Sequence, residues 1–372
     1  MTPYVIEPVS EALLPEALRL LREFVGTSYF GADPAYVRWQ YFMSPFKAGV
    51  VARDDYSMLA CLDGQRHILA LDAFLPWTTY IDGHAVPTVW DIEWMNFAKI
   101  PGLGRTLVKD LRSRTRMYCG YGMNELSLKA YEKLGYPVCP EIERRVAILD
   151  ADACYMLFQN KESAGQEGFF REMAARVPAS KTGYDLIHDV TAVSEAYWQA
   201  HLGRCKATSR KDKEALKWRY VDHPYIKYKI LGLGQRAERG LAVVRIEPIK
   251  GHASRVARIL EMFPVQGHEP ELVKAVLAFA SEEGCVMADF FCGSSALAAA
   301  ICPEPFVSLK VHREYFIPMR FQPIEIRARR SINMVLDLDE PHRHVTFDDL
   351  YVTKGDGDQD VYVNPEYKTI SV

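Results

Sequence analysis

Three side chains in the first half of the sequence could transfer protons: Asp91, Glu93 and Tyr131. A carboxylate can accept a proton from a reacting group, and a tyrosine hydroxyl can donate one, so such residues suit general acid–base catalysis. Asp91 and Glu93 lie in a predicted strand, 88–97, where strict alternation places both on one face with Met95. Buried carboxylates without a partner are costly, which favours a functional role for the pair.

Each of these candidates also has a structural alternative. One of the two carboxylates could simply pair with a basic residue such as Arg144 or Arg145. On a predicted helix, 125–134, Tyr131 shares a face with Leu128 and Leu134, so its ring could be part of the core. The residues alone leave both interpretations open.

A loop with two glycines follows the carboxylate strand and leads into a predicted helix, 105–114. Gly102 and Gly104 allow successive backbone N–H groups to point at an anion near the positive end of the helix dipole. Lys99 and Arg105 add positive charge at the same place. The loop therefore predicts an anion site, although a Gly-x-Gly turn is often only a tight connection.

Two segments resemble motifs of the GNAT acyltransferase superfamily. Lys99-x-x-Gly102-x-Gly104 is similar to the pyrophosphate loop of that family, Q/R-x-x-G-x-G/A, with lysine in the first position. Residues 124–136 resemble its second motif, N-x-x-A/S-x-x-x-Y-x-x-x-G-F/Y, with the tyrosine at Tyr131. The two segments occur in the family's order and at its spacing.

The resemblance implies an acyl-CoA co-substrate held between the strand that ends near Phe97 and a second strand, 116–121. Tyr131 then matches the tyrosine that serves many members as general acid in the aminolysis of the thioester. Asp91 or Glu93 could take the proton of the attacking amine, directly or through water. The coenzyme contacts that the resemblance implies are Met95, Asn96, Phe97, Lys99, Gly102, Leu103, Gly104, Arg105, Thr106 and Asn124.

An internal repeat divides the chain into two similar halves. Residues 39–46, WQYFMSPF, match residues 218–225, WRYVDHPY, in the pattern W-Q/R-Y-x-x-S/H-P-F/Y. Strands and helices are predicted in the same order after each copy. We therefore expect a mixed α/β fold of two GNAT-like units in tandem, each a mostly antiparallel mixed sheet flanked by helices. The expected divisions are a coenzyme-binding unit 1–150, a linker with a bridging helix 151–182, a degenerate unit 183–340 and a C-terminal tail 341–372.

The second half lacks the features of the predicted coenzyme site. Its corresponding loop has one glycine, Gly267, and carries Pro264 and Glu269, which remove a donor and repel an anion. We expect this half to close a pocket for the acceptor between the halves. The polar residues His223, His268 and Asp289 are its candidate acceptor-binding residues.

Composition restricts the class of protein. The 372 residues carry a net charge of −3, which gives no electrostatic reason to bind nucleic acid or a membrane. The eight cysteines are dispersed without metal-binding spacing, so we expect reduced thiols, no metal and a cytoplasmic protein. The acidic segment 354–360 lacks the full calcium-loop pattern and is interpreted as a turn.

The tandem pattern resembles bacterial enzymes of surface-polysaccharide pathways that N-acylate nucleotide-linked amino-deoxysugars. The resemblance implies transfer of an acetyl or hydroxyacyl group, such as hydroxybutyryl, to a nucleotide-linked amino sugar. Two alternatives stay open: a Fem-like transferase that uses aminoacyl-tRNA, and a non-catalytic acyl-CoA-binding protein. The sequence gives no indication of the oligomeric state.

Overall fold

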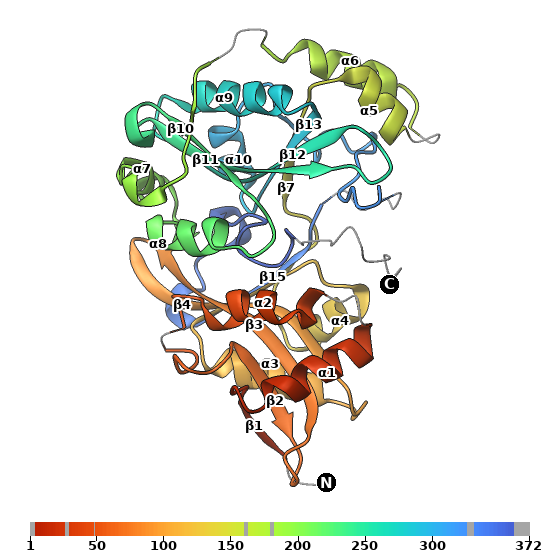
Figure 1. Cartoon of the computed structure of the whole chain (residues 1–372), viewed down its shortest axis with the longest axis vertical. Coiled ribbons are helices and arrows are strands. Elements are labelled where there is room, and N and C mark those ends of the chain that lie inside the picture. The colour runs from red at the N-terminus through yellow and green to blue at the C-terminus, as the bar shows by residue number, and fades with distance from the viewer. Residues whose placement is uncertain are drawn as a thin grey trace.

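Two β-sheets, one above the other in Figure 1, form the two halves of the molecule. The computed structural model describes residues 4–26, 30–47, 49–159, 163–178, 182–325 and 331–360. Parts of the predicted linker, 160–162 and 179–181, and the end of the predicted tail, 361–372, lie outside the described residues.

The first sheet is mixed and mostly antiparallel, as predicted, and β4 and β5 are parallel neighbours in it. Its strands, in spatial order, are β1 (Val5–Pro8), β2 (Met58–Leu62), β3 (Ile68–Ile81), β4 (His84–Asn96), β5 (Met117–Tyr121), β15 (Met334–Leu338) and β6 (Val138–Cys139). Two short strands extend it beside β3, namely β9 (Ala207–Ser209) and β16 (Leu350–Tyr351).

The second sheet repeats this arrangement, with β12 and β13 as its parallel neighbours. Its strands, in spatial order, are β8 (Asp185–Leu186), β10 (Lys229–Leu233), β11 (Gly240–Pro248), β12 (Arg255–Pro264), β13 (Cys285–Cys292), β7 (Glu143–Ile148) and β14 (Val307–Ser308). The prediction of two mixed α/β units in tandem is therefore confirmed.

The two halves exchange one strand each, which the sequence did not reveal. β7 lies in the predicted first unit but pairs with β13 of the second sheet, whereas β15 lies in the predicted second unit but pairs with β5 of the first. The predicted units 1–150 and 183–340 therefore each contain one strand that belongs to the sheet of the other half. Each exchanged strand satisfies the backbone groups of a sheet in the other half, so the halves are bound by main-chain hydrogen bonds.

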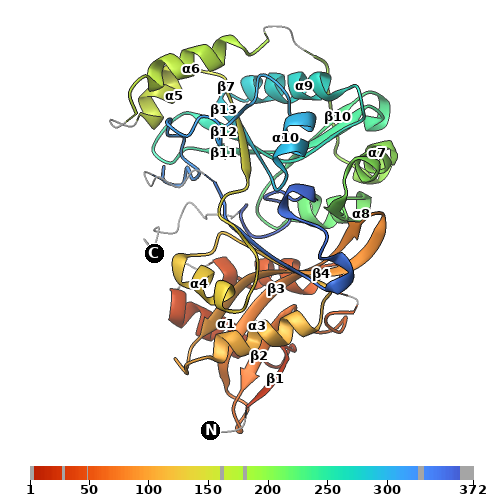
Figure 2. The ribbon, with the colours of Figure 1, turned by 180° about the vertical axis from the view of Figure 1, so that it is seen from behind.

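Helices cover both faces of each sheet. In the first half α1 and α2 lie on one face, and Figure 2 shows α3 and α4 on the other. The α-helices are α1 (Leu14–Val25), α2 (Pro34–Val37), α3 (Leu103–Ser113), α4 (Glu125–Lys133), α5 (Ala151–Phe158), α6 (Gln166–Ala175), α7 (Ala196–Arg204), α8 (Lys213–Leu216), α9 (Glu269–Glu282) and α10 (Ser295–Ile301). Short 3-10 helices are η1 (Phe30–Ala32), η3 (Val190–Ala192), η5 (Gln235–Ala237), η6 (Glu340–His342) and η7 (Phe347–Asp349). No helix in the described part of the chain is both long and apolar enough to span a membrane.

The two copies of the internal repeat meet where the halves join. Each copy forms a π-helical turn, η2 (Arg38–Phe42) and η4 (Lys217–Val221). The indole N–H of Trp39 donates to the backbone oxygen of Trp218 at 2.9 Å, and the indole N–H of Trp218 donates to that of Trp39 at 3.1 Å. The repeated tryptophan is therefore explained by a reciprocal contact between the halves.

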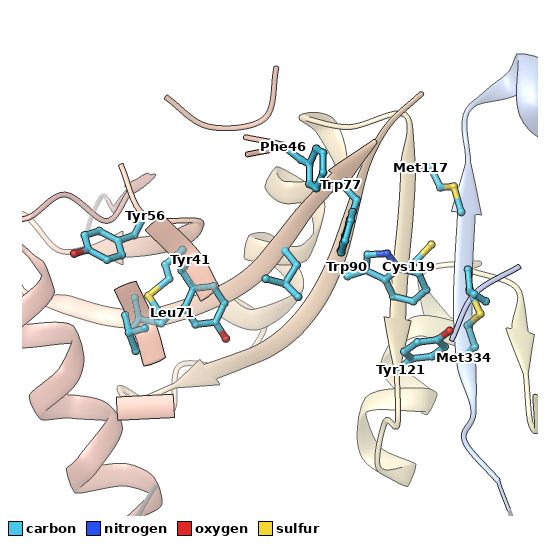
Figure 3. Packing of buried hydrophobic residues seen from close by; sticks show 14 of the residues in the cluster. Tyr41, Phe46, Tyr56, Leu71, Trp77, Trp90, Met117, Cys119, Tyr121 and Met334 are labelled. Atoms are coloured by element: carbon cyan, nitrogen blue, oxygen red, sulfur yellow. The ribbon is translucent and has the colours of Figure 1, made fainter. Parts of the chain in front are cut away.

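Aromatic side chains fill the core of the first half near this joint. Figure 3 shows Phe46 beside Trp77, whose rings stack with centroids 4.9 Å apart, and Trp90 beside Tyr121 at 4.5 Å. Met334 of β15 lies beside Tyr121 in the same cluster. The exchanged strand thus supplies apolar side chains to this core as well as hydrogen bonds.

Candidate active site between the two halves

The parallel strands β4 and β5 separate before either ends. Their pairing runs from Thr88 with Met117 to Asp91 with Gly120. From Ile92 to Asn96, β4 continues without a described strand on that side, so its backbone N–H and C=O groups line a wedge-shaped opening. Such an unpaired strand edge can bind an extended amide-containing ligand as an added strand.

The glycine loop lies at the end of β4 and begins α3. Gly102 precedes the helix in a left-handed conformation, with φ of 86°. The N–H of Thr106 donates to the oxygen of Gly102, and that of Leu103 donates to Ile100, so these two are not free for a ligand. The N–H groups of Gly102, Gly104 and Arg105 donate to no described backbone group. The predicted set of anion donors is accordingly reduced to these three.

Gly104 is required by a contact within the chain. A β-carbon at this position would lie 2.5 Å from the indole ring of Trp94 on β4. From the sequence, we expected this glycine to allow direct approach of a pyrophosphate. In the structure, the group that approaches it is the indole ring of Trp94. Trp94 also lines the pocket described next, so its ring lies between the loop and that pocket.

A cavity of about 480 Å³ lies between the two halves. One wall is formed by β4, the end of β5 and α4, including Glu93, Trp94, Asn124 and Tyr131. The remaining lining residues come from the second half and from the C-terminal segment 354–360: Arg245, Glu247, Arg258, Met319, Arg320, Gln322, Lys354, Asp358, Gln359 and Asp360. The opening between β4 and β5 thus leads into a pocket that both halves enclose.

Asp91 and Tyr131, predicted to act together, are in direct contact. The hydroxyls of Tyr131 and Tyr118 both donate to Oδ2 of Asp91, and the two hydroxyl oxygens are 3.1 Å apart. Asp72 on β3 is fully buried next to Asp91 and accepts no hydrogen bond from a described donor. Burial, and then the charge of Asp91, raise the pKa of Asp72 well above its usual range.

This arrangement determines which of the two carboxyl groups, Asp72 or Asp91, is protonated next to the two tyrosines. Because two adjacent buried carboxylates cannot both be charged, Asp72, whose pKa is raised well above its usual range, keeps its proton next to Asp91. Burial raises the pKa of Asp91 also, while the two tyrosine hydroxyls oppose that shift. Tyr131 is the member of the group that both lines the pocket and contacts Asp91.

The prediction that Asp91 and Glu93 share one face of the strand is wrong. The register between β3 and β4 shifts at this point: Phe74 pairs with Asp91 and Ala73 with Glu93, so Ile92 is an extra residue, a β-bulge. Asp91 consequently points to Tyr118 and Tyr131, under α3 and α4, whereas Glu93 lies with Tyr41 on the opposite face. Both residues still line the pocket.

Glu93 is the better candidate for a base. Burial, with a smaller contribution from the charge of Asp358, raises the pKa of Glu93 to about 8. A carboxylate with this pKa is a much stronger base than an exposed glutamate. Neither of the predicted alternative partners, Arg144 and Arg145, pairs with it: Arg144 binds Asp289, and Arg145 binds the backbone oxygens of Cys302 and Phe306.

The other predicted coenzyme contacts have varied surroundings. The side chain of Asn96 bonds the backbone of Ile100 and thereby shapes the loop, and that of Asn124 caps α4 through the N–H of Ser127. Met95 is buried, and Phe97 packs edge-on against Phe24 of α1. For Met95 and Asn96 it is the backbone, at the unpaired edge of β4, that lines the opening, and Phe97 follows directly after the strand. Lys99 is exposed in the loop.

The equivalent opening in the second half is filled by the chain itself. β12 and β13 separate after Ile259 and Phe290, and beyond this point the hydroxyl of Tyr351 accepts from the N–H of Met262 on β12. The N–H groups of Gly293 and Ser294 donate to the oxygens of Val352 and Leu350. In the loop before α9, the carboxylate of Glu269 accepts from the N–H of Gly267 at 2.9 Å, as expected for a loop that repels anions. The second half therefore has no open coenzyme site among its described residues.

Two of the residues predicted to bind an acceptor have structural roles, and the third lies away from the pocket. Nδ1 of His223 accepts from the backbone N–H groups of Tyr225 and Ile226, which fixes the turn after the repeat. Asp289 is buried between Arg144 and Arg258 and does not line the pocket. His268 pairs with Glu271 at the start of α9. These three predictions are corrected by the structure, because turn formation and ion pairing already use the two buried groups.

The C-terminal segment 354–360, interpreted from the sequence as a turn, does begin with a turn, and most of it is buried in the molecule. Lys354, Asp358 and Asp360 line the pocket, and Asp356 forms a buried ion pair with Lys211. Gly357 lies against the ring of Tyr121. The alternating acidic residues of segment 354–360 were the only signal in the sequence that could have indicated that this segment lines the pocket.

Solved structures with similar folds were found, although no protein-family model and no curated protein matches the sequence. A GCN5-related N-acetyltransferase from Kribbella flavida is 14% identical with a TM-score of 0.54, covering 91% of this chain and 71% of that one. One from Anabaena variabilis is 10% identical with a TM-score of 0.53, covering 90% and 73%. N-myristoyltransferase from Saccharomyces cerevisiae with bound myristoyl-CoA is 11% identical with a TM-score of 0.50, covering 90% and 83%. These likenesses show the fold: two GNAT-like units in tandem, as the sequence predicted.

Proposed function

We propose that this chain is an acyl-CoA-dependent N-acyltransferase that acylates a small-molecule amine by direct aminolysis. The observation that carries the proposal is the convergence of three features on one pocket. These are the unpaired edge of β4, the hydroxyl of Tyr131 and the carboxylate of Glu93. The first fits an extended pantetheine arm, and the other two supply the proton transfers that aminolysis needs.

The residues present fit an acyl-CoA co-substrate at the β4–β5 opening. The N–H groups of Gly102, Gly104 and Arg105 at the start of α3 suit its pyrophosphate, with Lys99 adding charge nearby. The backbone of 92–96 suits its amides. The equivalent opening of the second half is filled by 350–353, which is consistent with one coenzyme site in the first half.

In the proposed reaction the acceptor nitrogen forms a bond to the thioester carbon, and the carbon–sulfur bond breaks. Glu93 takes the proton from the amine, and Tyr131 gives its proton to the leaving thiolate. Asp91 accepts a hydrogen bond from Tyr131 and lies next to the protonated Asp72, so the proton lost by Tyr131 can be replaced from this pair. Asp91, proposed from the sequence as a base, thus acts behind Tyr131.

For the acceptor we keep the sequence-based proposal of a nucleotide-linked amino sugar, and for the acyl group an acetyl or short hydroxyacyl chain such as hydroxybutyryl. An amine with a pKa near 8 can pass its proton to Glu93 at little cost, because the two pKa values are similar. A lysine-like amine, with a pKa of about 10.4, is a poorer match. We expect amino sugars to be acylated faster than lysine peptides or polyamines.

The experiment that tests the proposal is release of free CoA thiol from acyl-CoAs of different length, with and without a panel of amines. Amine-dependent thiol release supports an N-acyltransferase. Transfer from aminoacyl-tRNA with no use of acyl-CoA would favour the Fem-like alternative. Binding of acyl-CoA without turnover of any amine would favour a non-catalytic binding protein.

Replacement of Glu93 by glutamine should remove a limb of the pH–rate profile. A base with a pKa of about 8 is active when ionised, so wild-type kcat should rise with pH up to about 8 and fall about tenfold per pH unit below it. Glu93→Gln should lower kcat at pH 8 by about 10²-fold and abolish this dependence. An unchanged pH profile in the variant would show that another group takes the proton.

Gly104→Val should weaken acyl-CoA binding at least tenfold, or about 1.4 kcal/mol, in a calorimetric titration. A valine side chain would displace the Trp94 ring and crowd the three N–H donors. Gly203→Val on exposed α7 is the matched control, because nothing lies within 4 Å of its added β-carbon. Gly267 is unsuitable, since its φ of 90° strains any other residue there. Equal affinities of the two variants would place the coenzyme elsewhere.

A further inference from the structure

The two walls of the pocket differ in their charged groups. On the wall from the first half, β4 supplies the acidic residues Asp91 and Glu93, and the charge of Asp358 raises the pKa of Glu93. That wall includes no lysine or arginine among its described residues. On the other side lie basic residues of the second half and of the C-terminal segment, Arg245, Arg258, Arg320 and Lys354. A ligand that spans this pocket meets carboxyl groups at one end and basic side chains at the other.

Two of the four basic residues are already compensated by carboxylates. Arg245 pairs with Asp360 at 2.8 Å. Arg258 pairs with Glu247 and with Asp289, both at 3.0 Å, and donates to the oxygen of Met319. Their positive charges are therefore largely neutralised within the protein.

Lys354 differs, because no described carboxylate lies within ion-pair distance of its ammonium group. The side chain is 5% exposed, lines the pocket and lies over the ring of Phe291, with Nζ 4.2 Å from the ring centroid. Burial, and then the neighbouring charge of Arg258, lower the pKa of Lys354 to about 7. A buried cation without an anionic partner is costly, and a bound anion would compensate it.

The chain holds Lys354 in place from both sides. The backbone N–H of Thr353 donates to Asp356 at 2.7 Å, which closes a turn with Lys354 at its second position. Asp356 is bound in turn by Lys211 at 2.8 Å, and its backbone oxygen accepts from the indole of Trp77. Gly355 cannot carry a side chain, because a β-carbon would collide with the hydroxyl of Tyr220. The lysine is therefore presented from a rigid turn.

We propose that the acceptor carries an anionic group, a carboxylate or a phosphate, in addition to its amine, and that Lys354 binds this anion. The amine then lies at the opposite wall, where Glu93 can take its proton. This inference rests on the proposed acyltransfer function and narrows its substrate to dipolar amines. It makes Lys354 a residue that determines specificity.

The test compares acceptors that differ only in the anionic group, using the full-length protein and acetyl-CoA. One arm pairs α-amino acids with their amides, and the other pairs phosphorylated amino sugars with the unphosphorylated sugars. We expect at least one arm to show a KM that is at least tenfold lower for the anionic member. The responding arm identifies carboxylate or phosphate.

The variant Lys354→Met should remove this preference by raising the KM of the anionic acceptor at least tenfold, with little effect on the neutral one. Lys354→Arg should retain part of the preference. Lys47→Met is the matched control, because Lys47 is equally buried but bonds backbone oxygens away from the pocket. Unfolding curves of each variant check the fold.

The outcomes separate this inference from the proposed function. Turnover of neutral and anionic amines with equal KM, unchanged by Lys354→Met, would overturn the anion site and leave the acyltransferase proposal standing. Absence of turnover with every amine would overturn both. A preference for anionic acceptors that survives Lys354→Met would show that another group binds the anion.

Discussion

Tyr131→Phe should lower kcat by about 10²-fold while the affinity for acyl-CoA stays the same. The substitution removes the hydroxyl that donates to Asp91 and that we propose protonates the leaving thiolate. The ring keeps its contacts, including stacking on Tyr136 at 5.9 Å, so the fold should be retained. Steady-state kinetics and a binding titration with the same acyl-CoA measure the two effects separately.

Tyr118→Phe provides the matched control for this prediction. Tyr118 also donates to Oδ2 of Asp91, but it is fully buried and does not line the pocket. Both variants lose a hydrogen bond to a carboxyl group and should lose similar stability, about 1.5–3 kcal/mol. Only Tyr131→Phe should also lose most of its turnover. Equal losses of kcat in the two variants would reduce Tyr131 to a packing residue.

Lys211→Met should lower the free energy of unfolding by about 3–5 kcal/mol, because it leaves two buried carboxyl groups without their cation. Lys211 lies 2.6 Å from Glu261 and 2.8 Å from Asp356, and all three side chains are buried. The hydroxyl of Tyr220 also donates to Glu261. Urea unfolding followed by tryptophan fluorescence measures the loss.

Loss of this ion pair should also weaken acceptor binding in the pocket. Asp356 holds the turn that presents Lys354, so Lys211→Met should raise the KM of the acceptor as well. Lys129→Met is the control, since Lys129 pairs with Glu125 on the exposed surface of α4 and should cost less than about 0.5 kcal/mol. A Lys211 variant as stable as the Lys129 variant would contradict the assigned role of the buried ion pair.

Local patterns in the sequence were sufficient for most of the fold. The repeat at Trp39 and Trp218 indicated two similar halves, and the helices around the glycine loop and Tyr131 begin and end within two residues of their predicted bounds. Hydrophobic periodicity and turn residues report such elements because they depend on neighbours a few positions apart. The exchange of β7 and β15 left no such pattern in the sequence, because pairing between strands that are distant in the chain depends on tertiary structure.

The candidate site was predicted only in part from such local patterns. Asp91, Glu93 and Tyr131 were identified from their chemical type and spacing, and all three line the pocket. Strict alternation failed at Ile92, because one inserted residue turns the following side chains to the other face. Lys354 and its segment were missed, since their position follows from contacts with residues more than a hundred positions away, such as Lys211 and Trp77.

The central claim is that the first half binds acyl-CoA, and thermal or urea unfolding with added acetyl-CoA tests it most directly. Binding at 100 times Kd should stabilise the protein by about 2.7 kcal/mol, and Gly104→Val, with at least tenfold weaker binding, should keep no more than about 1.4 kcal/mol of it at the same ligand concentration. Titration with acyl-CoAs of increasing length then indicates which acyl group the pocket accepts. Absence of stabilisation by any acyl-CoA, in a wild-type protein that unfolds cooperatively, would contradict the account.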